Sequence, residues 1–254
     1  MRPNLNIRPI SFVIFAAGKG KRFWPITKKI PKVILKIKEK PLIGYVLDTA
    51  KKMGAKEVFI VIEYKKEMIK KKIGNKYHGL PIKYIIQKGS EGLVHNIAKV
   101  GEVINSDFVL LLGDEIYLNT KHKKIIPFYL KEKPDGVCGI SKGASPELIK
   151  KGYSVEVRGK FISKVAEKPE KTVNDLRGWG TYVFDRSVFD FIKKTPINSK
   201  TGKKELADLI QTMINAGKKF LPFNLEGFLV NVNTKEDLTE ARKLMKKKNE
   251  NGKN

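Results

Sequence analysis

The sequence predicts an α/β fold in which helices cover both faces of a mostly parallel sheet. Strand-like apolar runs alternate with helix-like amphipathic runs over residues 12–112, which is the rhythm of repeated strand–helix–strand units. The run Phe108–Leu112 is apolar at every position, as expected of a central strand that is buried on both faces. Such sheets bind ligands at the carboxyl ends of their strands, so the loops that follow the strands are the first candidates for a site.

The first half of the chain keeps this alternation strictly. Its strands are rich in Val, Ile and Phe, and the segments between them carry apolar residues at helical spacing. The first of these helices ends directly before Gly54, which is a typical helix C-terminus. The predicted strands are Phe12–Ala16, Glu57–Ile62, Ile82–Ile86 and Phe108–Leu112, and the predicted helices are Pro41–Met53, Lys65–Ile73 and Leu93–Ile104.

The second half is less regular. Two alternating segments, Tyr153–Val157 and Phe161–Ala166, flank Arg158-Gly159-Lys160 and predict a β-hairpin. Thr234–Asp237 has the pattern of a capping box that opens a last helix. Further strands are predicted at Gly136–Ile140, Trp179–Phe184 and Phe228–Val232, and helices at Lys121–Lys131 and Glu205–Asn215. We expect a single domain over residues 1–254 with halves at about 10–120 and 121–240, and a frayed tail over 246–254.

The amino-acid composition excludes some classes of function and disfavours others. Cys138 is the only cysteine, which excludes an intrachain disulfide and a thiolate metal site. No apolar run is long enough to span a bilayer, so we expect a cytoplasmic protein without a membrane partner. The net charge of +26 raises a nucleic-acid-binding alternative, but the lysines are spread over nearly every predicted helix, which disfavours it. Of the three histidines, His78 and His122 are expected at the surface.

The loop after the first strand is the strongest candidate for a phosphate site. The segment Ser11–Pro25 (SFVIFAAGKGKRFWP) runs from an apolar strand into a loop with two glycines, two lysines and an arginine. Glycines let backbone N–H groups turn toward an anion, and the cations neutralise it. The loop is neither a Walker A motif nor a dinucleotide fingerprint, because Phe23 stands where the latter needs a third glycine. An ordinary lysine-rich turn is the alternative interpretation.

Two further strand ends carry polar residues suited to a nucleotide. Asp114 follows the buried run directly, where a carboxylate can hold Mg²⁺ against a triphosphate. Gln87 ends the third strand, and its primary amide offers both a donor and an acceptor to the edge of a base. The structural alternatives are a common Gly-Asp turn at the first position and a solvated loop at the second.

Taken in order, these motifs resemble the signature of the sugar-1-phosphate nucleotidylyltransferases, which include the glucose-1-phosphate uridylyl- and thymidylyltransferases. The similarity covers Phe12 to Leu238. It departs from the family pattern at four positions. Lys21 stands where a small hydroxyl residue is usual, Glu115 replaces an Asn, Asn231 replaces a second metal-binding Asp, and Asn233 replaces a Gly. The similar segments are AAGKGKRFWPIT with PKVIL, the stretch from Gln87 to Ile97, LLGDEIY, Gly152-Tyr153, Glu167-Lys168-Pro169, GTYVF and FLVNVNTKEDL.

The resemblance implies a Rossmann-like three-layer sandwich of the nucleotide-diphospho-sugar transferase type. It also implies a Mg²⁺-dependent transfer of a nucleotidyl group from an NTP, with UTP or dTTP favoured, to a sugar 1-phosphate. The implied catalytic residues are Arg22, Lys32, Asp114 and Lys168, and the implied metal ligands are Asp114 and Asn231. Nucleotide binding is implied for Ala16, Ala17, Gly18, Gly20, Lys21, Gln87 and Gly92, and sugar-phosphate binding for Gly152, Glu167, Lys168 and Gly180.

Several alternatives stay open at this point. Lys21 looks more like related cytidylyltransferases, which keeps a CTP-dependent enzyme acting on a phospho-alcohol in view. Lys21 and Asn231 together also suit a sensor that binds a nucleotide sugar without turnover. The sequence does not decide the base, the sugar, or whether Asn231 or Asn233 supports the metal, and it leaves a homo-oligomer open.

Overall fold

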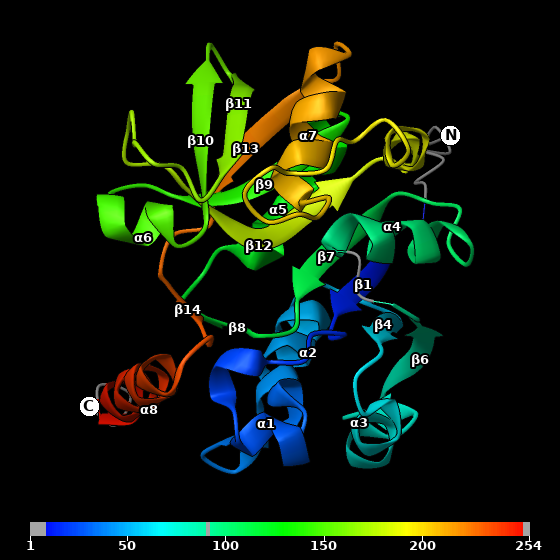
Figure 1. Ribbon diagram of the computed structural model, residues 1–254, viewed down its shortest axis with the longest axis vertical. Helices are drawn as coiled ribbons and strands as arrows, with labels where there is room; N and C mark the ends of the chain where they lie inside the picture. The colour runs from blue at the N-terminus through cyan, green and yellow to red at the C-terminus, as the bar shows by residue number, and fades with distance from the viewer. Residues whose placement is uncertain (1–8, 90–91, 251–254) are drawn as a thin grey trace, which may run out of the picture.

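A ten-stranded sheet forms the centre of the computed structural model, which describes residues 9–89 and 92–250 (Figure 1). The main path of the sheet has the strand order β11-β10-β12-β7-β1-β4-β6-β5 in the described residues. Strand β9 pairs with β12, and β13 pairs with β9. Strands from both halves of the chain therefore share one sheet.

The parallel part of the sheet is built by the first half of the chain. Strand β1 (Ser11–Phe15) lies between β4 (Val58–Ile62) and β7 (Phe108–Leu112), and β6 (Leu80–Ile86) pairs with β4, all in parallel. Every residue of β4 is buried, and so are the apolar residues of β1. Their carboxyl ends lie at one edge, as predicted.

Helices cover both faces, which confirms the three-layer prediction. Side chains alternate along β1, so Val13 and Phe15 pack in one core while Phe12 and Ile14 pack in the other. The first core includes α4 (Leu93–Gly101) and α7 (Leu206–Asn215). The second core is formed with the helices α2 (Leu42–Lys52), α3 (Lys66–Ile73) and α5 (Ile125–Glu132).

The second half of the chain extends the sheet in antiparallel directions. Strand β12 (Arg177–Phe184) pairs with β7, and the predicted hairpin of β10 (Tyr153–Arg158) and β11 (Phe161–Glu167) follows it. Strand β9 (Gly136–Ser141) pairs with the far side of β12, and α6 (Pro146–Lys150) precedes the hairpin.

Strand β13 (Phe220–Asn224) was not predicted. It contains Pro222, which cannot donate a backbone hydrogen bond and so argues against a strand. The strand tolerates this proline because it pairs on one side only, with β9.

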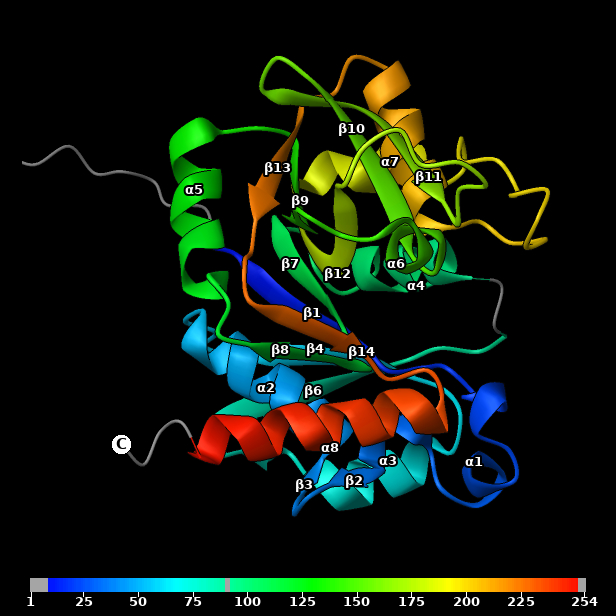
Figure 2. The same cartoon turned by 90° about the vertical axis from the view of Figure 1, so that its left-hand side faces the viewer.

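A two-stranded ribbon brings the end of the chain back to the sheet. Strand β8 (Glu115–Leu118) pairs antiparallel with β14 (Phe228–Asn231), and helix α8 (Lys235–Glu250) lies beside them (Figure 2). The predicted capping box opens α8: the N–H of Asp237 donates to Thr234 Oγ1 at 3.2 Å, and the N–H of Thr234 donates to Asp237 Oδ2 at 2.7 Å. The helix continues to Glu250, into the segment predicted as a frayed tail, and residues 251–254 lie outside the described part.

Short elements complete the path. They are the helix α1 (Ile26–Lys29), the strands β2 (Lys36–Ile37), β3 (Lys40–Pro41) and β5 (Lys76–Tyr77), and the 3-10 helices Lys21–Phe23, Lys32–Ile34, His122–Lys124 and Arg186–Phe191. None of the helices in the described residues is both long enough and apolar enough to cross a lipid bilayer.

One histidine prediction is wrong. His78 is exposed as expected, but His122 is only 3% exposed. The ring nitrogens of His122 lie 2.6 Å from Thr120 Oγ1 and 3.0 Å from Thr181 Oγ1, so hydroxyl groups satisfy both of them. Burial lowers the pKa of His122 to about 3, so it is a neutral core residue below the site described next.

We predict that Gly113→Ala destabilises the fold. An added Cβ would lie 2.7 Å from the backbone oxygen of Phe15, so β1 and β7 would have to separate. The free energy of unfolding, measured by urea denaturation, is expected to fall by about 1–3 kcal/mol. The matched control is Gly18→Ala, where a Cβ meets nothing within 4 Å, and it is expected to stay within about 0.5 kcal/mol of the wild type. Equal stabilities of the two variants would contradict the packing argument.

Candidate active site

Backbone hydrogen bonds align three of the predicted loops at one edge of the sheet. The N–H of Gly113 donates to Phe15 O at 2.9 Å, and the N–H of Gln87 donates to Ile62 O at 2.9 Å. The loop after β1 and the Gly113-Asp114 turn are thereby held next to each other. Gln87 follows β6, the third strand from β7, which puts it roughly 14 Å from Asp114.

A lysine–aspartate pair joins the first two loops. Lys32 Nζ lies 2.5 Å from Asp114 Oδ2, and their side chains are 9% and 25% exposed. Lys32 stands at the start of a 3-10 helix, and Gly20 packs against it with φ +61. An added Cβ on Gly20 would lie 3.0 Å from Lys32 Cβ, so only glycine lets the loop backbone approach this closely.

Asn233 links this pair to a second cation. Its Oδ1 accepts from Arg22 Nη2 at 3.0 Å and from Lys32 Nζ at 3.3 Å. Its Nδ2 donates to Asn231 Oδ1 at 2.5 Å, and its backbone N–H donates to Asp237 Oδ2 at 2.8 Å. The sequence had offered Asn233 only as an alternative metal residue, and its bridging role emerges because β14 returns beside Asp114.

A buried glutamate anchors the other end of the network. Glu115 is 2% exposed, and its carboxylate accepts from Tyr117 Oη at 2.8 Å, Gly180 N at 2.9 Å and Asn231 Nδ2 at 3.3 Å. Burial, followed by the charge of Asp114, raises the pKa of Glu115 to about 7. Sequence reasoning recorded Glu115 only as a departure from the family's Asn, and that departure was the one available signal.

Gly180 has no room for a side chain. A Cβ there would lie 2.7 Å from Glu115 Oε2 and 2.5 Å from Leu112 Cγ. This glycine therefore allows β12 to pass directly against the buried carboxylate.

A cavity of about 950 Å³ opens beside the network. Among the predicted site residues, Arg22, Lys168 and Asn231 line it, together with Asn233. The N–H of Lys168 donates to Gly152 O at 2.7 Å, which fixes the turn after β11 next to the end of α6. The cavity thus lies between the hairpin side of the sheet and helix α8.

Glu167 faces a different hollow, of about 460 Å³, which Asp208 also lines. Burial and then the carboxylate of Glu205 raise the pKa of Glu167 to about 7, against the opposite effect of Lys168. The two neighbouring residues 167 and 168 therefore point to two separate spaces.

Gln87 and Gly92 form the remaining predicted group. Gln87 is 2% exposed; its Nε2 donates to Gly89 O at 2.8 Å, while its buried Oε1 has no partner among the described residues. Gly92 has φ +110, and an added Cβ would lie 2.7 Å from the backbone oxygen of Lys204. The start of α4 is thus packed tightly against the 203–204 segment.

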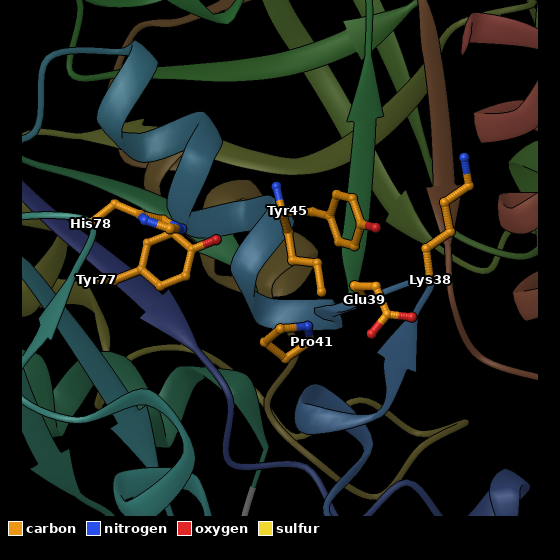
Figure 3. Close-up of a pocket in the computed structure, with 7 residues that line it drawn as sticks. Lys38, Glu39, Pro41, Tyr45, Tyr77 and His78 are labelled. Carbon is orange, nitrogen blue, oxygen red and sulfur yellow. The ribbon is translucent and has the colours of Figure 1, made fainter.

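A separate hollow of about 380 Å³ holds none of the predicted site residues (Figure 3). Tyr45, Tyr77 and His78 are among the residues that line it. The hydroxyl of Tyr77 donates to Gly44 O at 3.1 Å and that of Tyr45 to Ile37 O at 2.6 Å, so both are already satisfied within the fold.

We predict that the stability contribution of Glu167 depends on pH. Its folded pKa of about 7 lies above the usual 4.5, so the folded state binds the proton more tightly than the unfolded state. Stability therefore rises as the pH falls from about 7 toward 4.5. The difference in free energy of unfolding between Glu167→Gln and the wild type is measured by urea denaturation at about pH 5 and about pH 8. We expect this difference to favour the variant more at about pH 8 than at about pH 5.

A second variant tests the cause of this pH dependence. Glu205→Gln removes the carboxylate that raises the pKa of Glu167, and it should weaken the dependence. A stability difference between Glu167→Gln and the wild type that is the same at both pH values would contradict the assignment.

Comparisons with known proteins agree with this geometry. UTP–glucose-1-phosphate uridylyltransferase AglF of Haloferax volcanii is 29% identical over 229 residues, which cover 90% of this chain and 93% of the relative. The bifunctional protein GlmU of Methanocaldococcus jannaschii is 28% identical over 234 residues, which cover 92% of this chain but only 53% of the relative. The chain thus matches AglF along almost its whole length and spans about half of GlmU.

Solved structures give the same result. A UDP-glucose pyrophosphorylase complexed with UDP-glucose superposes with a TM-score of 0.82 at 26% identity, covering 94% of this chain and all of the other. An apo UDP-glucose pyrophosphorylase has a TM-score of 0.79 at 24% identity over 95% of this chain, which supports the fold alone. Residues 11–248 also match the family described as nucleotidyl transferase. These matches confirm the family resemblance seen in the sequence: the chain belongs to the nucleotidyl transferase family.

Proposed function

We propose that this enzyme transfers a nucleotidyl group from an NTP, with UTP or dTTP favoured, to a sugar 1-phosphate and releases pyrophosphate. The observation that carries the proposal is the Lys32–Asp114 pair, joined through Asn233 to Arg22 beside a cavity large enough for an acceptor. The name of the relative AglF, a UTP–glucose-1-phosphate uridylyltransferase, supports the choice of substrates.

The chemistry needs positioning and charge neutralisation more than proton transfer. A phosphate oxygen of the acceptor forms a bond to the α-phosphorus, and the bond from that phosphorus to the bridging oxygen breaks with its electron pair going to pyrophosphate. Since the attacking oxygen is already anionic, no general base is required. Arg22 and Lys32 would neutralise the triphosphate and the leaving pyrophosphate, and Lys168 would hold the incoming phosphate.

The loop after β1 would hold the triphosphate through its backbone. A Cβ added to Gly18 would meet nothing within 4 Å, so space beside this backbone is free for an anion. We assign the loop residues Ala16, Ala17, Gly18, Gly20 and Lys21 to this contact.

The donor set suits Mg²⁺. Asp114 Oδ2 is engaged by Lys32, which leaves Oδ1 as the available carboxylate oxygen, and the amide oxygen of Asn231 lies in the same network. No group of three or more His, Cys, Asp or Glu side chains in the described part of the chain is arranged to hold a metal ion. Asp114 and Asn231 would therefore hold Mg²⁺ together with substrate phosphates and water. When bound, the ion would neutralise charge on the reacting phosphates.

The base and the sugar would bind on opposite sides of this centre. Gln87 presents an unpaired acceptor, because its Nε2 donates to Gly89 O at 2.8 Å and to Lys88 O at 3.5 Å while its Oε1 has no partner among the described residues. This acceptor suits the N–H of uracil or thymine. Gly92 would allow the base to approach the backbone. On the acceptor side we assign Gly152, Glu167, Lys168 and Gly180. Lys168 lines the large cavity, Glu167 lines the neighbouring hollow, and Gly180 lets β12 pass directly against Glu115.

We further propose that both sides belong to one domain, with the nucleotide half at about 10–120 and the sugar-phosphate half at about 121–240. The pairing of β7 with β12 supports this division of labour within one sheet. A cytoplasmic setting fits a reaction that consumes an NTP and a chain with a single, buried cysteine.

A substrate screen tests the proposal. Pyrophosphate release is measured with UTP, dTTP, CTP, ATP and GTP, each combined with glucose 1-phosphate or phosphocholine, with and without Mg²⁺. We expect turnover with a pyrimidine triphosphate and the sugar phosphate, and its loss when EDTA is added. Turnover with CTP and phosphocholine alone would favour the cytidylyltransferase alternative, and nucleotide-sugar binding without any pyrophosphate release would overturn the enzymatic proposal.

Asp114→Ala is predicted to lower kcat by about 10²–10³ because it removes both the partner of Lys32 and the only carboxylate assigned to the metal. Steady-state pyrophosphate release gives the measurement. Glu39→Ala is the matched control: the Glu39 side chain is 96% exposed and lies outside the network, so kcat should stay within about twofold. Near-full activity of Asp114→Ala would remove this residue from the mechanism.

Gln87→Met is predicted to raise KM for UTP by about 3–10-fold through loss of one hydrogen bond to the base. Inhibition by inorganic tripolyphosphate provides the control, since this probe has no base and its inhibition constant should not change. An equal loss for UTP and for tripolyphosphate would mean that Gln87 acts on the loop structure and not on the base.

A further inference from the structure

We propose that Arg177 binds a second anionic group on the acceptor, so that the preferred acceptor is an acidic sugar 1-phosphate. The inference rests on the proposed function and specifies its substrate class. It assigns a role to a residue that the sequence motifs do not include.

The guanidinium of Arg177 is partly withdrawn from water and has no direct partner in the part of the chain that the structure describes. The side chain is half-buried, its Nε is fully buried without a partner, and no hydrogen bond or ion pair joins the guanidinium to another described residue. Burial lowers the pKa of Arg177, which reflects the cost of removing this cation from solvent. A guanidinium has five N–H donors, and leaving them unsatisfied in a protein wall is unfavourable unless a ligand uses them.

Arg177 lies beside the turn that carries Lys168 and is separated along β12 from Gly180. It lies three residues before Gly180 on β12, which puts its Cα about 10 Å along the strand from the residue that touches Glu115. Its Nε passes 3.8 Å from the point where a Cβ on Gly152 would stand, next to the Lys168 turn. Lys168 is thus available for the 1-phosphate, and Arg177 for a group further out on the acceptor.

The surrounding charges favour an anionic ligand. Among the described residues that line the cavity, the carboxylates Glu236, Asp237 and Glu240 are outnumbered two to one by cations. Glu115, Asp237 and Glu240 interact with Arg177 electrostatically, yet none of them forms an ion pair with it. The cationic side chains on the lining are Arg22, Lys142, Lys150, Lys151, Lys168 and Arg177.

Trp179, two residues further along β12, has a second unsatisfied donor in the same wall of the cavity. Its side chain is 2% exposed and lines the cavity, and its indole Nε1 is buried without a partner. The ring stacks on Tyr117 with centroids 6.1 Å apart, which holds it in place below Arg177. Two donors without a partner among the described residues, one of them on a charged group, therefore lie in this wall of the cavity.

The planar guanidinium pairs in bidentate fashion with either a carboxylate or a phosphate. The second group of the acceptor is accordingly the carboxylate of a uronic acid or a second phosphate on the sugar. Glucuronic acid 1-phosphate and glucose 1,6-bisphosphate represent these two sources, and glucose 1-phosphate, which lacks a second anionic group, is the reference.

The experiment compares kcat/KM for the three acceptors with UTP. We expect the wild type to favour at least one acidic acceptor over glucose 1-phosphate by about tenfold, since a charged hydrogen-bonded pair contributes at this level. Arg177→Gln should lower kcat/KM for that acceptor by about 10–100-fold and change the value for glucose 1-phosphate by less than about threefold. Arg158→Gln, an exposed arginine at the end of β10, is the matched control and should change neither value.

A binding measurement supplies a readout that does not depend on turnover. Calorimetry with UDP-glucuronate and UDP-glucose should show that Arg177→Gln weakens only the first, and Arg177→Lys should restore part of the affinity. Equal losses of kcat/KM in Arg177→Gln for glucose 1-phosphate and for the acidic acceptors would overturn the inference. Such a result would mean that Arg177 supports Glu115. A wild type that uses glucose 1-phosphate but neither acidic acceptor would also overturn it and leave the proposed function intact, whereas no turnover with any NTP and sugar phosphate would refute the proposed function itself.

Discussion

The ion pair between Lys32 and Asp114 is the contact on which the site depends. It connects the segment after β1 with the turn after β7, two neighbouring strands whose register is fixed along five residue pairs. Two glycines make this approach feasible, Gly20 against the lysine stem and Gly113 against the backbone of β1. A mostly buried pair of this kind is weak as a source of stability, because desolvation offsets much of its attraction. In the proposed mechanism, its role is to hold a cation and a carboxylate at a defined separation beside the reacting phosphates.

The other half of the site comes from the far end of the chain. Strand β14 pairs with β8, and the N–H of Val232 donates to Asp114 O at 2.9 Å, so Asn231 and Asn233 arrive on either side of this bond. The capping box of α8 then holds Asn233 in place, because the carboxylate of Asp237 accepts from the backbone N–H groups of Asn233 and Thr234. The C-terminal helix therefore contributes to the candidate site, because its first turn holds Asn233, the residue that Arg22 and Lys32 share.

Local sequence signals predicted much of this. The continuous apolar runs and the helical spacings predicted all four parallel strands and the helices between them. A strand that is buried on both faces, such as Phe108–Leu112, is recognisable because its consecutive residues are apolar. Features that depend on distant partners were missed. Strand β8 forms because β14 returns to pair with it, and β13 accommodates Pro222 because it pairs on one side only. His122 is buried where its ring meets Thr181 on β12. The sequence named Asn233 only as an alternative metal residue and did not single out Arg177, because the contacts of both residues depend on what faces them across the fold.

The shared acceptor on Asn233 affects how strongly its two cationic neighbours are held before a substrate binds. Two cations rest on one uncharged oxygen, at 3.0 and 3.3 Å. An amide oxygen keeps them oriented but holds each of them less tightly than a carboxylate would. Under the proposed function, an incoming polyphosphate would meet Arg22 held only by this neutral group, whereas it would meet Lys32 already paired with the carboxylate of Asp114. An aspartate at position 233 would pair directly with Arg22 and place a second carboxylate beside Lys32, so the neutral amide of Asn233 leaves the charge of Arg22 available.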